Sequence, residues 1–357
     1  MKKFAKPIII TIICSLLVLF LKNQFSSLLL TNATYGMPAL INQGQIENLY
    51  IGSSMFRQGL DIMTLEASAE NTNYILAYNG NQPALEYYQL KNLLDHNVKI
   101  NHLFIDMYVY SAWETPEISD EKLFMEIGLK EKWDLWNLIS NEPQTSFESL
   151  FRMFVSSNNE LLLTWPVNAM LINSQFYRGG TLTRTSGADA EVLAHTTAPE
   201  ISENMNETQE YYLGQLIELA RENNISVTLL ETPKYNTVAS DSSYLQAMEK
   251  YVAFANQENV SVILSENTSG YLKNTAYSAV SYHFDHKNAA YFMDSIHLSY
   301  EGRVAFTALL THHEIPNKFR CTADPFKRVA RTDQDMSEPP TSLQAASLPL
   351  PQRSLLY

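Results

Sequence analysis

Cysteine is nearly absent from this chain, which has only Cys14 and Cys321 among its 357 residues. Cys14 lies inside an apolar run near the amino terminus, so we expect no disulfide within the body of the protein. Basic residues are also outnumbered, and the formal net charge is −13. We therefore do not expect nucleic acid as a partner, because the protein's own charge would repel a polyanion.

Residue spacings typical of metal sites are missing as well. His283, Asp285 and His286 form the segment HFDH, and His312 and His313 are adjacent near the end of the body. Neither group has the spacing of a zinc site with a fourth ligand. We therefore predict no metal and no other cofactor.

A long apolar run occurs once, at the amino terminus. Three lysines within the first six residues precede the run Pro7–Leu21, a pattern typical of an export signal or a membrane anchor. The run is shorter than the ~20 residues of a full span, but Lys22 can snorkel and Leu28–Leu30 extend the apolar character. We predict a single-pass anchor over residues 1–30 with an extracytoplasmic body. The alternative is a protein secreted after signal cleavage.

The body alternates short apolar runs with amphipathic segments. This alternation predicts an α/β fold with a parallel sheet and helices on both faces. In such sheets the ligand site lies beyond the carboxyl ends of the strands, where Ser54, Gly80 and Pro233 fall. The expected strands are Leu49–Ile51, Tyr74–Tyr78, His102–Tyr110, Ile225–Leu230 and Val260–Leu264, and the expected helices are Ala84–His96, Glu207–Asn223 and Ser243–Gln257.

Two segments depart from this alternation. Residues 111–206 hold all four tryptophans and read as a helical insertion in a domain over residues 31–315. The insertion either caps the site or simply adds to the core. Residues 316–357 have little apolar periodicity and several prolines, which predicts a disordered tail.

The first catalytic candidate is a serine at the end of a predicted strand. Gly52 is the only one of the twelve glycines with a serine two residues later, in the stretch YIGSS that ends at Ser54. A serine on a tight turn after a strand is exposed and can act as a nucleophile near N–H groups that stabilise an anion. A plain turn or a helix cap is the alternative.

The second candidate is a pair near the other end of the body. His297 is the only one of eight histidines with an aspartate three residues before it, in Asp294-Ser295-Ile296-His297. At that spacing the carboxylate can accept the Nδ1–H of the imidazole and leave Nε2 free to take a proton from serine. A surface Asp–His pair is the alternative.

These stretches resemble the blocks of the SGNH, or GDSL-type, hydrolase family. YIGSS is similar to its first block, with Ser54 in the nucleophile position and Ser53 where the family usually has Asp; DSIHLSYEGR is similar to its last block. YNGN resembles the second block, so Gly80 would offer its N–H to the oxyanion. The resemblance implies a three-layer flavodoxin-like sandwich over about residues 48–310.

The third block departs from the family pattern. The family has an Asn here as an oxyanion donor, but the corresponding stretch reads FIDMYVYS, and ionised Asp106 cannot donate a hydrogen bond. Asn79, Asn81 or the hydroxyl of Tyr108 could replace it.

The stretch GSSMFRQGLD, the stretch ETPKY and the amino-terminal anchor resemble a bacterial cell-surface branch of this family. That branch is tied to acylation of teichoic acids and exopolysaccharides. Arg57, one helical turn after Ser54, could meet an anionic substrate group or simply face solvent.

These observations together predict a membrane-anchored, extracytoplasmic serine esterase or O-acyltransferase. Ser54 would attack, His297 would act as base and acid, Asp294 would orient His297, and Ser54 and Gly80 would hold the oxyanion, with Asn79 nearby. The expected partners are an acylated surface glycan or teichoic acid, the membrane and a membrane-bound acyltransferase. The alternative is a non-catalytic binding protein of a surface-polymer acylation machinery.

Overall fold

The computed structural model describes residues 2–31, 36–68, 72–116, 129–139, 175–198, 201, 204–272 and 279–312. All of them belong to the unit Met1–Asp324, and the second unit is Pro325–Tyr357. The predicted tail over 316–357 therefore lies outside the described residues, as does most of the predicted insertion over 111–206.

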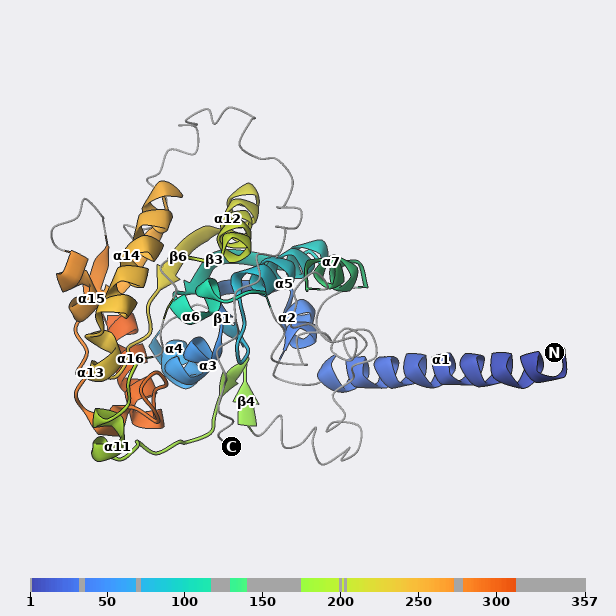
Figure 1. Cartoon of the computed structure of the whole chain (residues 1–357), viewed down its shortest axis with the longest axis horizontal. Coiled ribbons are helices and arrows are strands. Elements are labelled where there is room, and N and C mark those ends of the chain that lie inside the picture. Colours follow the sequence, from blue (N-terminus) through green and yellow to red (C-terminus); the bar gives the residue numbers. More distant parts are fainter. Residues whose placement is uncertain are drawn as a thin grey trace, which may run out of the picture. The chain divides into compact units, whose positions relative to one another are not determined.

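The described chain is built from parallel strands that alternate with helices (Figure 1). The six strands of the main sheet are β1 (Gln45–Gly52), β2 (Asn73–Ala77), β3 (Lys99–Asp106), β6 (Ser226–Leu230), β7 (Ser261–Ser265) and β8 (Val280–Tyr282). They lie in the order β2-β1-β3-β6-β7-β8, and every neighbouring pair is parallel. The predicted α/β class with a parallel sheet is confirmed.

Helices account for most of the remaining described residues. They are α1 (Lys2–Thr31), α2 (Met37–Gln43), α3 (Ser54–Gly59), α4 (Ile62–Ser68), α5 (Pro83–Asp95), α6 (Val109–Trp113), α7 (Leu129–Ile139), α11 (Ala190–Ala194), α12 (Glu207–Glu222), α13 (Asn236–Ala239), α14 (Ser242–Gln257), α15 (Glu266–Tyr271), the 3-10 turn η3 (Ala289–Tyr291) and α16 (Tyr300–His312). A small antiparallel pair joins β4 (Phe176–Tyr177) to β5 (Gly180–Thr181).

Alternate side chains of β1, β2, β3, β6 and β7 enter two separate apolar clusters. Along β1, Leu49 and Ile51 pack with α5, α12 and α14, whereas Tyr50 packs with α3, α4 and α16. This division follows from the two-residue period of a strand, whose successive side chains point to opposite faces. The result is a sheet covered by helices on both faces (Figure 1), the layering expected of a flavodoxin-like sandwich.

The strand order places a change of direction between β1 and β3. From β1 the chain moves outward to β2, then returns past β1 to β3 and continues to β8. In an open parallel sheet, such a reversal creates a crevice at the carboxyl ends of the two strands where the order turns. Ser53 and Asp106 lie at the ends of these two strands.

Two expectations about elements need correction. The strand predicted over His102–Tyr110 ends at Asp106, and Val109 begins the short helix α6. Apolar residues continue across this boundary because both elements are buried, so periodicity could not locate it. The short edge strand β8 was not predicted, since its three residues are too few to give a pattern.

The amino-terminal segment forms the helix α1, which contains the apolar run Pro7–Leu21. Within the part of the chain that the structure describes, no helix is long and apolar enough to cross a membrane. The structure thus gives no support to the anchor predicted over residues 1–30.

Candidate active site

Ser54 begins helix α3 directly after strand β1. The residue before it, Ser53, is fully buried and caps the helix, accepting a hydrogen bond from the N–H of Met55 at 3.1 Å. We call Gly52–Met55 the serine turn. Gly52 is required here, because a Cβ at this position would lie 2.3 Å from the Cβ of Asp106 on the neighbouring strand.

The predicted partners of Ser54 come from a loop near the end of the body. The Oγ of Ser54 lies 2.8 Å from Nε2 of His297, and Nδ1 of His297 lies 2.8 Å from Oδ2 of Asp294. An ionised carboxylate can only accept hydrogen bonds, so Nδ1 carries the proton and Nε2 accepts from the serine hydroxyl. Residues predicted from two distant stretches are therefore in direct contact, 243 positions apart.

Local hydrogen bonds shape the loop that holds the histidine, Met293–Leu298, which we call the histidine loop. Oδ1 of Asp294 accepts from the main-chain N–H groups of Ile296 at 2.9 Å and His297 at 2.8 Å. Burial alone would raise the pKa of Asp294. The hydrogen bond to the His297 ring, the charge of that ring and the hydrogen bonds from the two main-chain N–H groups outweigh this effect, so the pKa of Asp294 is lowered. Asp294 therefore stays ionised as the partner of the imidazole.

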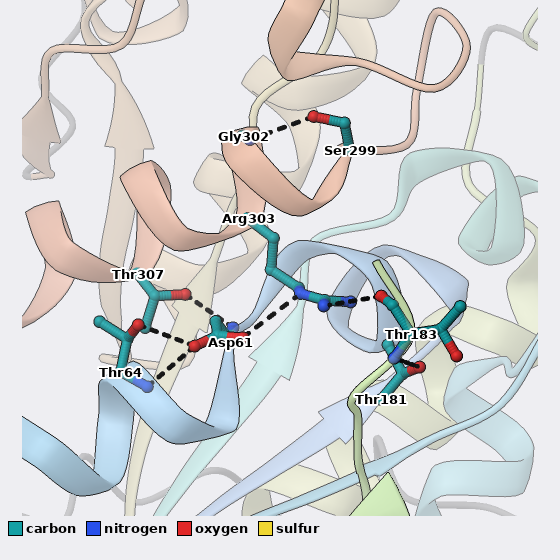
Figure 2. A network of polar contacts seen from close by, with 8 residues as sticks. All are labelled: Asp61, Thr64, Thr181, Thr183, Ser299, Gly302, Arg303 and Thr307. Atoms are coloured by element: carbon teal, nitrogen blue, oxygen red, sulfur yellow. Dashed lines mark hydrogen bonds and ion pairs between the residues drawn. The ribbon is translucent and has the colours of Figure 1, made fainter. Parts of the chain in front are cut away.

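A buried polar network ties α16, the helix that follows the histidine loop, to α4 and to the segment after β5 (Figure 2). The network centres on Arg303, which is fully buried in α16, and Asp61, which lies just before α4. The Nε of Arg303 lies 3.7 Å from Oδ1 of Asp61, and its Nη2 donates to the carbonyl of Thr183 at 3.1 Å. Asp61 also binds Thr64 and, through its N–H, Thr307. The network thus joins α16, α4 and the segment after β5.

Close packing supports the same connection. A Cβ on Gly302 would lie 2.0 Å from the carbonyl oxygen of Tyr291, so only glycine fits between α16 and η3. Ser299 begins the turn into α16, where its hydroxyl accepts from the N–H of Gly302 and donates to the carbonyl of Ala290. The Gly-Arg pair that follows His297 in the sequence therefore fixes where α16 begins relative to the histidine loop.

The turn that contains Gly80 lies beside the serine turn. The N–H of Tyr78 and the side chain of Asn81 both donate to the carbonyl of Gly52, at 3.1 and 3.2 Å. Gly80 has a φ of 63°, in the left-handed region that favours glycine. Among the described residues, the N–H groups of Ser54 and Gly80 have no hydrogen-bond acceptor, so both are available to a bound group.

The substitutes considered for the missing Asn donor differ in their positions. Asn81 is fully buried and uses both of its amide hydrogens, on Gly52 and on Gln89, so the suggestion that it donates to an oxyanion is wrong. Asn79 is exposed beside Gly80. Tyr108 is half-buried, and its pKa is raised by burial and by the nearby carboxylates of Asp106 and Asp294, so its hydroxyl stays protonated as a donor.

Arg57 lies one turn beyond Ser54 and is half-buried. Its guanidinium packs over the ring of Phe176 with the central carbon 5.1 Å from the ring centroid. The structure therefore places Arg57 against an aromatic ring of β4, where a cation–π contact attracts its guanidinium.

Sequence reasoning missed a group of buried charges behind the serine turn. Asp106, Glu231 and Lys234 are each less than 5% exposed. Burial raises the pKa of Asp106 to about 6 and lowers that of Lys234, and the attraction between the two opposes both shifts. The sequence did offer one signal for this group. Its members lie at or just after the ends of two strands, and polar residues at the ends of parallel strands meet at one edge of the sheet.

Glu231 fixes the chain after β6. Its carboxylate accepts from the hydroxyls of Tyr244 and Thr268 and from the N–H of Ser265, each at 2.8 Å. Lys234 donates to the carbonyl and the hydroxyl of Thr232 at 2.7 and 3.0 Å. The stretch ETPKY is therefore a buried structural element.

Comparisons with known proteins leave the family open. No family model matches the chain, and no curated protein matches it. Among solved structures, it is similar to a GDSL-like lipase from Bacteroides thetaiotaomicron, with 11% identity, a TM-score of 0.30, and coverage of 76% of this chain and 87% of that chain. It is also similar to a variant of an acetyl-xylooligosaccharide esterase from Geobacillus, with 13% identity, a TM-score of 0.31, and coverage of 75% and 93%. At identities and scores this low, the likeness assigns neither a family nor an activity.

Proposed function

We propose that the protein is a serine-dependent ester hydrolase or O-acyltransferase. The observation that carries this proposal is the continuous contact from Ser54 through His297 to Asp294, with both hydrogen bonds at 2.8 Å. A serine hydroxyl is a weak nucleophile unless a base removes its proton as it attacks. The histidine in this contact is oriented for that task.

The proposed reaction runs in two steps. His297 takes the proton of Ser54 as Oγ bonds to the ester carbonyl carbon, and the developing oxyanion is held by the N–H groups of Ser54 and Gly80. His297 then gives the proton to the leaving alcohol as its C–O bond breaks, which leaves an acyl group on Ser54. Water or a sugar hydroxyl, deprotonated by His297, attacks this acyl ester, and Ser54 recovers its proton. Water gives hydrolysis, and a sugar hydroxyl gives acyl transfer.

The surroundings of Ser54 support a polar acyl donor or acceptor. Arg57 and the exposed Asn79 lie close in sequence to Ser54 and Gly80, and we assign them to substrate contact. Tyr108, protonated and half-buried, is our candidate for the third oxyanion donor. The resemblance of the sequence blocks supports acyl esters of a surface glycan or teichoic acid as the substrate class, with a membrane-bound acyltransferase as the partner.

The location is a further part of this proposal. The lysines before the run Pro7–Leu21 support export, with residues 1–30 as an anchor and the body outside the membrane. A fusion reporter placed after Lys22 should be active only when exported. Reporter activity confined to the cytoplasm would remove the cell-envelope substrates from the proposal.

The direct test of the chemistry is labelling by a fluorophosphonate probe together with turnover of an activated acetyl ester. The wild-type protein should be labelled at Ser54 and should hydrolyse the ester, and Ser54→Ala should lose both. Ser269→Ala, on the surface of α15, serves as a matched control and should keep both. A protein that neither labels nor turns over any ester, while Ser54→Ala still supports polymer acylation in cells, would be a non-catalytic binding protein instead.

A further inference from the structure

A buried carboxylate behind the serine turn has no part in the reaction described above. Asp106 is the last residue of β3 and is 4% exposed. Its Oδ2 accepts hydrogen bonds from the N–H of Ser53 at 3.1 Å and from the hydroxyl of Ser53 at 2.5 Å. Because this hydroxyl oxygen also accepts from the N–H of Met55, its proton is directed to Asp106. The carboxylate thus fixes both the main chain and the side chain of the residue before Ser54.

Packing leaves Asp106 little freedom to move. Its Cβ lies against the Cα of Gly52, where no other residue type fits. Met107, the next residue, donates its N–H to the carbonyl of Leu230 on β6 at 3.0 Å. The carboxylate is therefore held by the sheet itself, and it transmits the position of β3 to the serine turn.

Several charged or titratable groups face this carboxylate. Lys234, which follows β6, attracts it, and His297 does so more weakly. The remaining groups are Glu86 on α5, Tyr108 after β3, and Tyr251 on α14, each of whose pKa values is raised by the charge of Asp106 in addition to burial. Lys234 is thus the cation that offsets the burial of Asp106.

We propose that Asp106 is a positioning residue for Ser54, whose ionised carboxylate holds Ser53 and so presents the Ser54 hydroxyl to His297. This inference rests on the proposed function and deepens it. Protonation of Asp106 would weaken both hydrogen bonds, because a neutral carboxyl is a poorer acceptor than a carboxylate. The serine turn would then lose its attachment to β3, and turnover would fall.

The proposal predicts a specific pH dependence. Full turnover requires His297 as a free base and Asp106 as an anion, and protonation of Asp106 lowers turnover without abolishing it. Burial raises the pKa of Asp106 to about 6, which brings its titration into an accessible range. Where Asp106 and His297 both take up protons, the logarithm of kcat/KM falls on the acid side with a slope above one, whereas protonation of His297 alone gives a slope of about one.

The experiment measures kcat, KM and probe labelling from acid to neutral pH for the wild type, Asp106→Asn and Ser53→Ala. For Asp106→Asn we expect the acid-side slope to fall from above one to about one and kcat to fall by about 10- to 100-fold, with KM nearly unchanged. Ser53→Ala keeps the buried charge pair intact and removes only the hydroxyl, so it should fold and should lose about 10-fold in kcat. Asp241→Asn, which removes the carboxylate cap of α14, is the matched control and should keep the wild-type slope.

The outcomes separate failure of the positioning role from failure of the proposed function. An active wild type with unchanged kcat in Ser53→Ala, or an Asp106→Asn profile that keeps the wild-type steepness, would overturn the positioning role and leave the proposed function standing. If Asp106→Asn does not fold, the kcat of Ser53→Ala decides alone. A wild type without ester turnover and without labelling at Ser54 would overturn both.

Discussion

The serine turn and the histidine loop meet at one hydrogen bond but are held in different ways. The serine turn is buried, and its polar contacts reach across to the next strand of the sheet, at Asp106. The histidine loop is partly exposed, with the side chain of Asp294 53% exposed, and most of its contacts are within the loop. Ser54 is therefore positioned by the core, whereas His297 depends on a short loop and on the anchoring of α16.

This difference predicts which substitutions affect chemistry and which affect stability. Changes at the point of contact should remove activity and leave the fold intact, because neither Ser54 nor His297 supports the core. Changes in the anchoring of α16 should act first on the fold. The predictions below follow this order of effect.

The largest effect should come from the contact itself. Ser54→Ala and His297→Ala should each reduce kcat by at least about four orders of magnitude, and the double variant should be no worse, because the triad acts as a unit. Thermal unfolding should change little, since both side chains are partly exposed. Ester turnover and melting temperature measured on the three variants check this, and additive losses in the double variant would contradict it.

The anchoring of α16 should carry the next largest effect. Arg303→Met leaves the carboxylate of Asp61 buried without its cation and should destabilise the fold by about 3–5 kcal/mol. Arg303→Lys keeps the charge and should cost less, although it loses the forked geometry. Adding Asp61→Asn to Arg303→Met should recover part of the loss, which denaturant unfolding of the single and double variants measures. Strict additivity would show that the pair does not act together.

The exposed carboxylate of the histidine loop should matter for rate rather than for stability. Asp294→Asn should fold normally but lose roughly two orders of magnitude in kcat, because a neutral amide no longer stabilises the charged imidazole. The loss should be smaller than for Ser54→Ala, since water reaches this side chain. A kcat within a few-fold of the wild type would mean that the loop positions His297 without Asp294.

The smallest effect should come from Gly80. Alanine in the left-handed region costs about 1–2 kcal/mol, so Gly80→Ala should shift the turn and reduce turnover by about tenfold while Ser54 remains open to the probe. Gly44→Ala is a matched control, because Gly44 also has a positive φ of 71° and a Cβ added there would meet no atom within 4 Å. Equal losses of turnover in both variants would contradict a role for the N–H of Gly80.

The sequence predicted most of the strands and the contact among Ser54, His297 and Asp294. Strand and helix periods are visible in short windows, and the two motifs are each unique in the chain. The order of the strands and the bond from Ser53 to Asp106 were not predictable from such windows. Both depend on which strands become neighbours, a tertiary choice that leaves no local pattern. The place of Asn81 was missed for a related reason, because its two acceptors, Gly52 and Gln89, become neighbours only in the fold.

The separation of 243 positions between Ser54 and His297 has a consequence for biosynthesis. The serine turn leaves the ribosome early, but its base emerges only when almost the whole body has been made. A chain interrupted anywhere between them lacks the triad, so ester turnover would report completed synthesis and closure of the domain. If the body is exported, the contact between Ser54 and His297 would form only after translocation is nearly complete, which would keep the nascent chain from reacting with esters on the wrong side of the membrane.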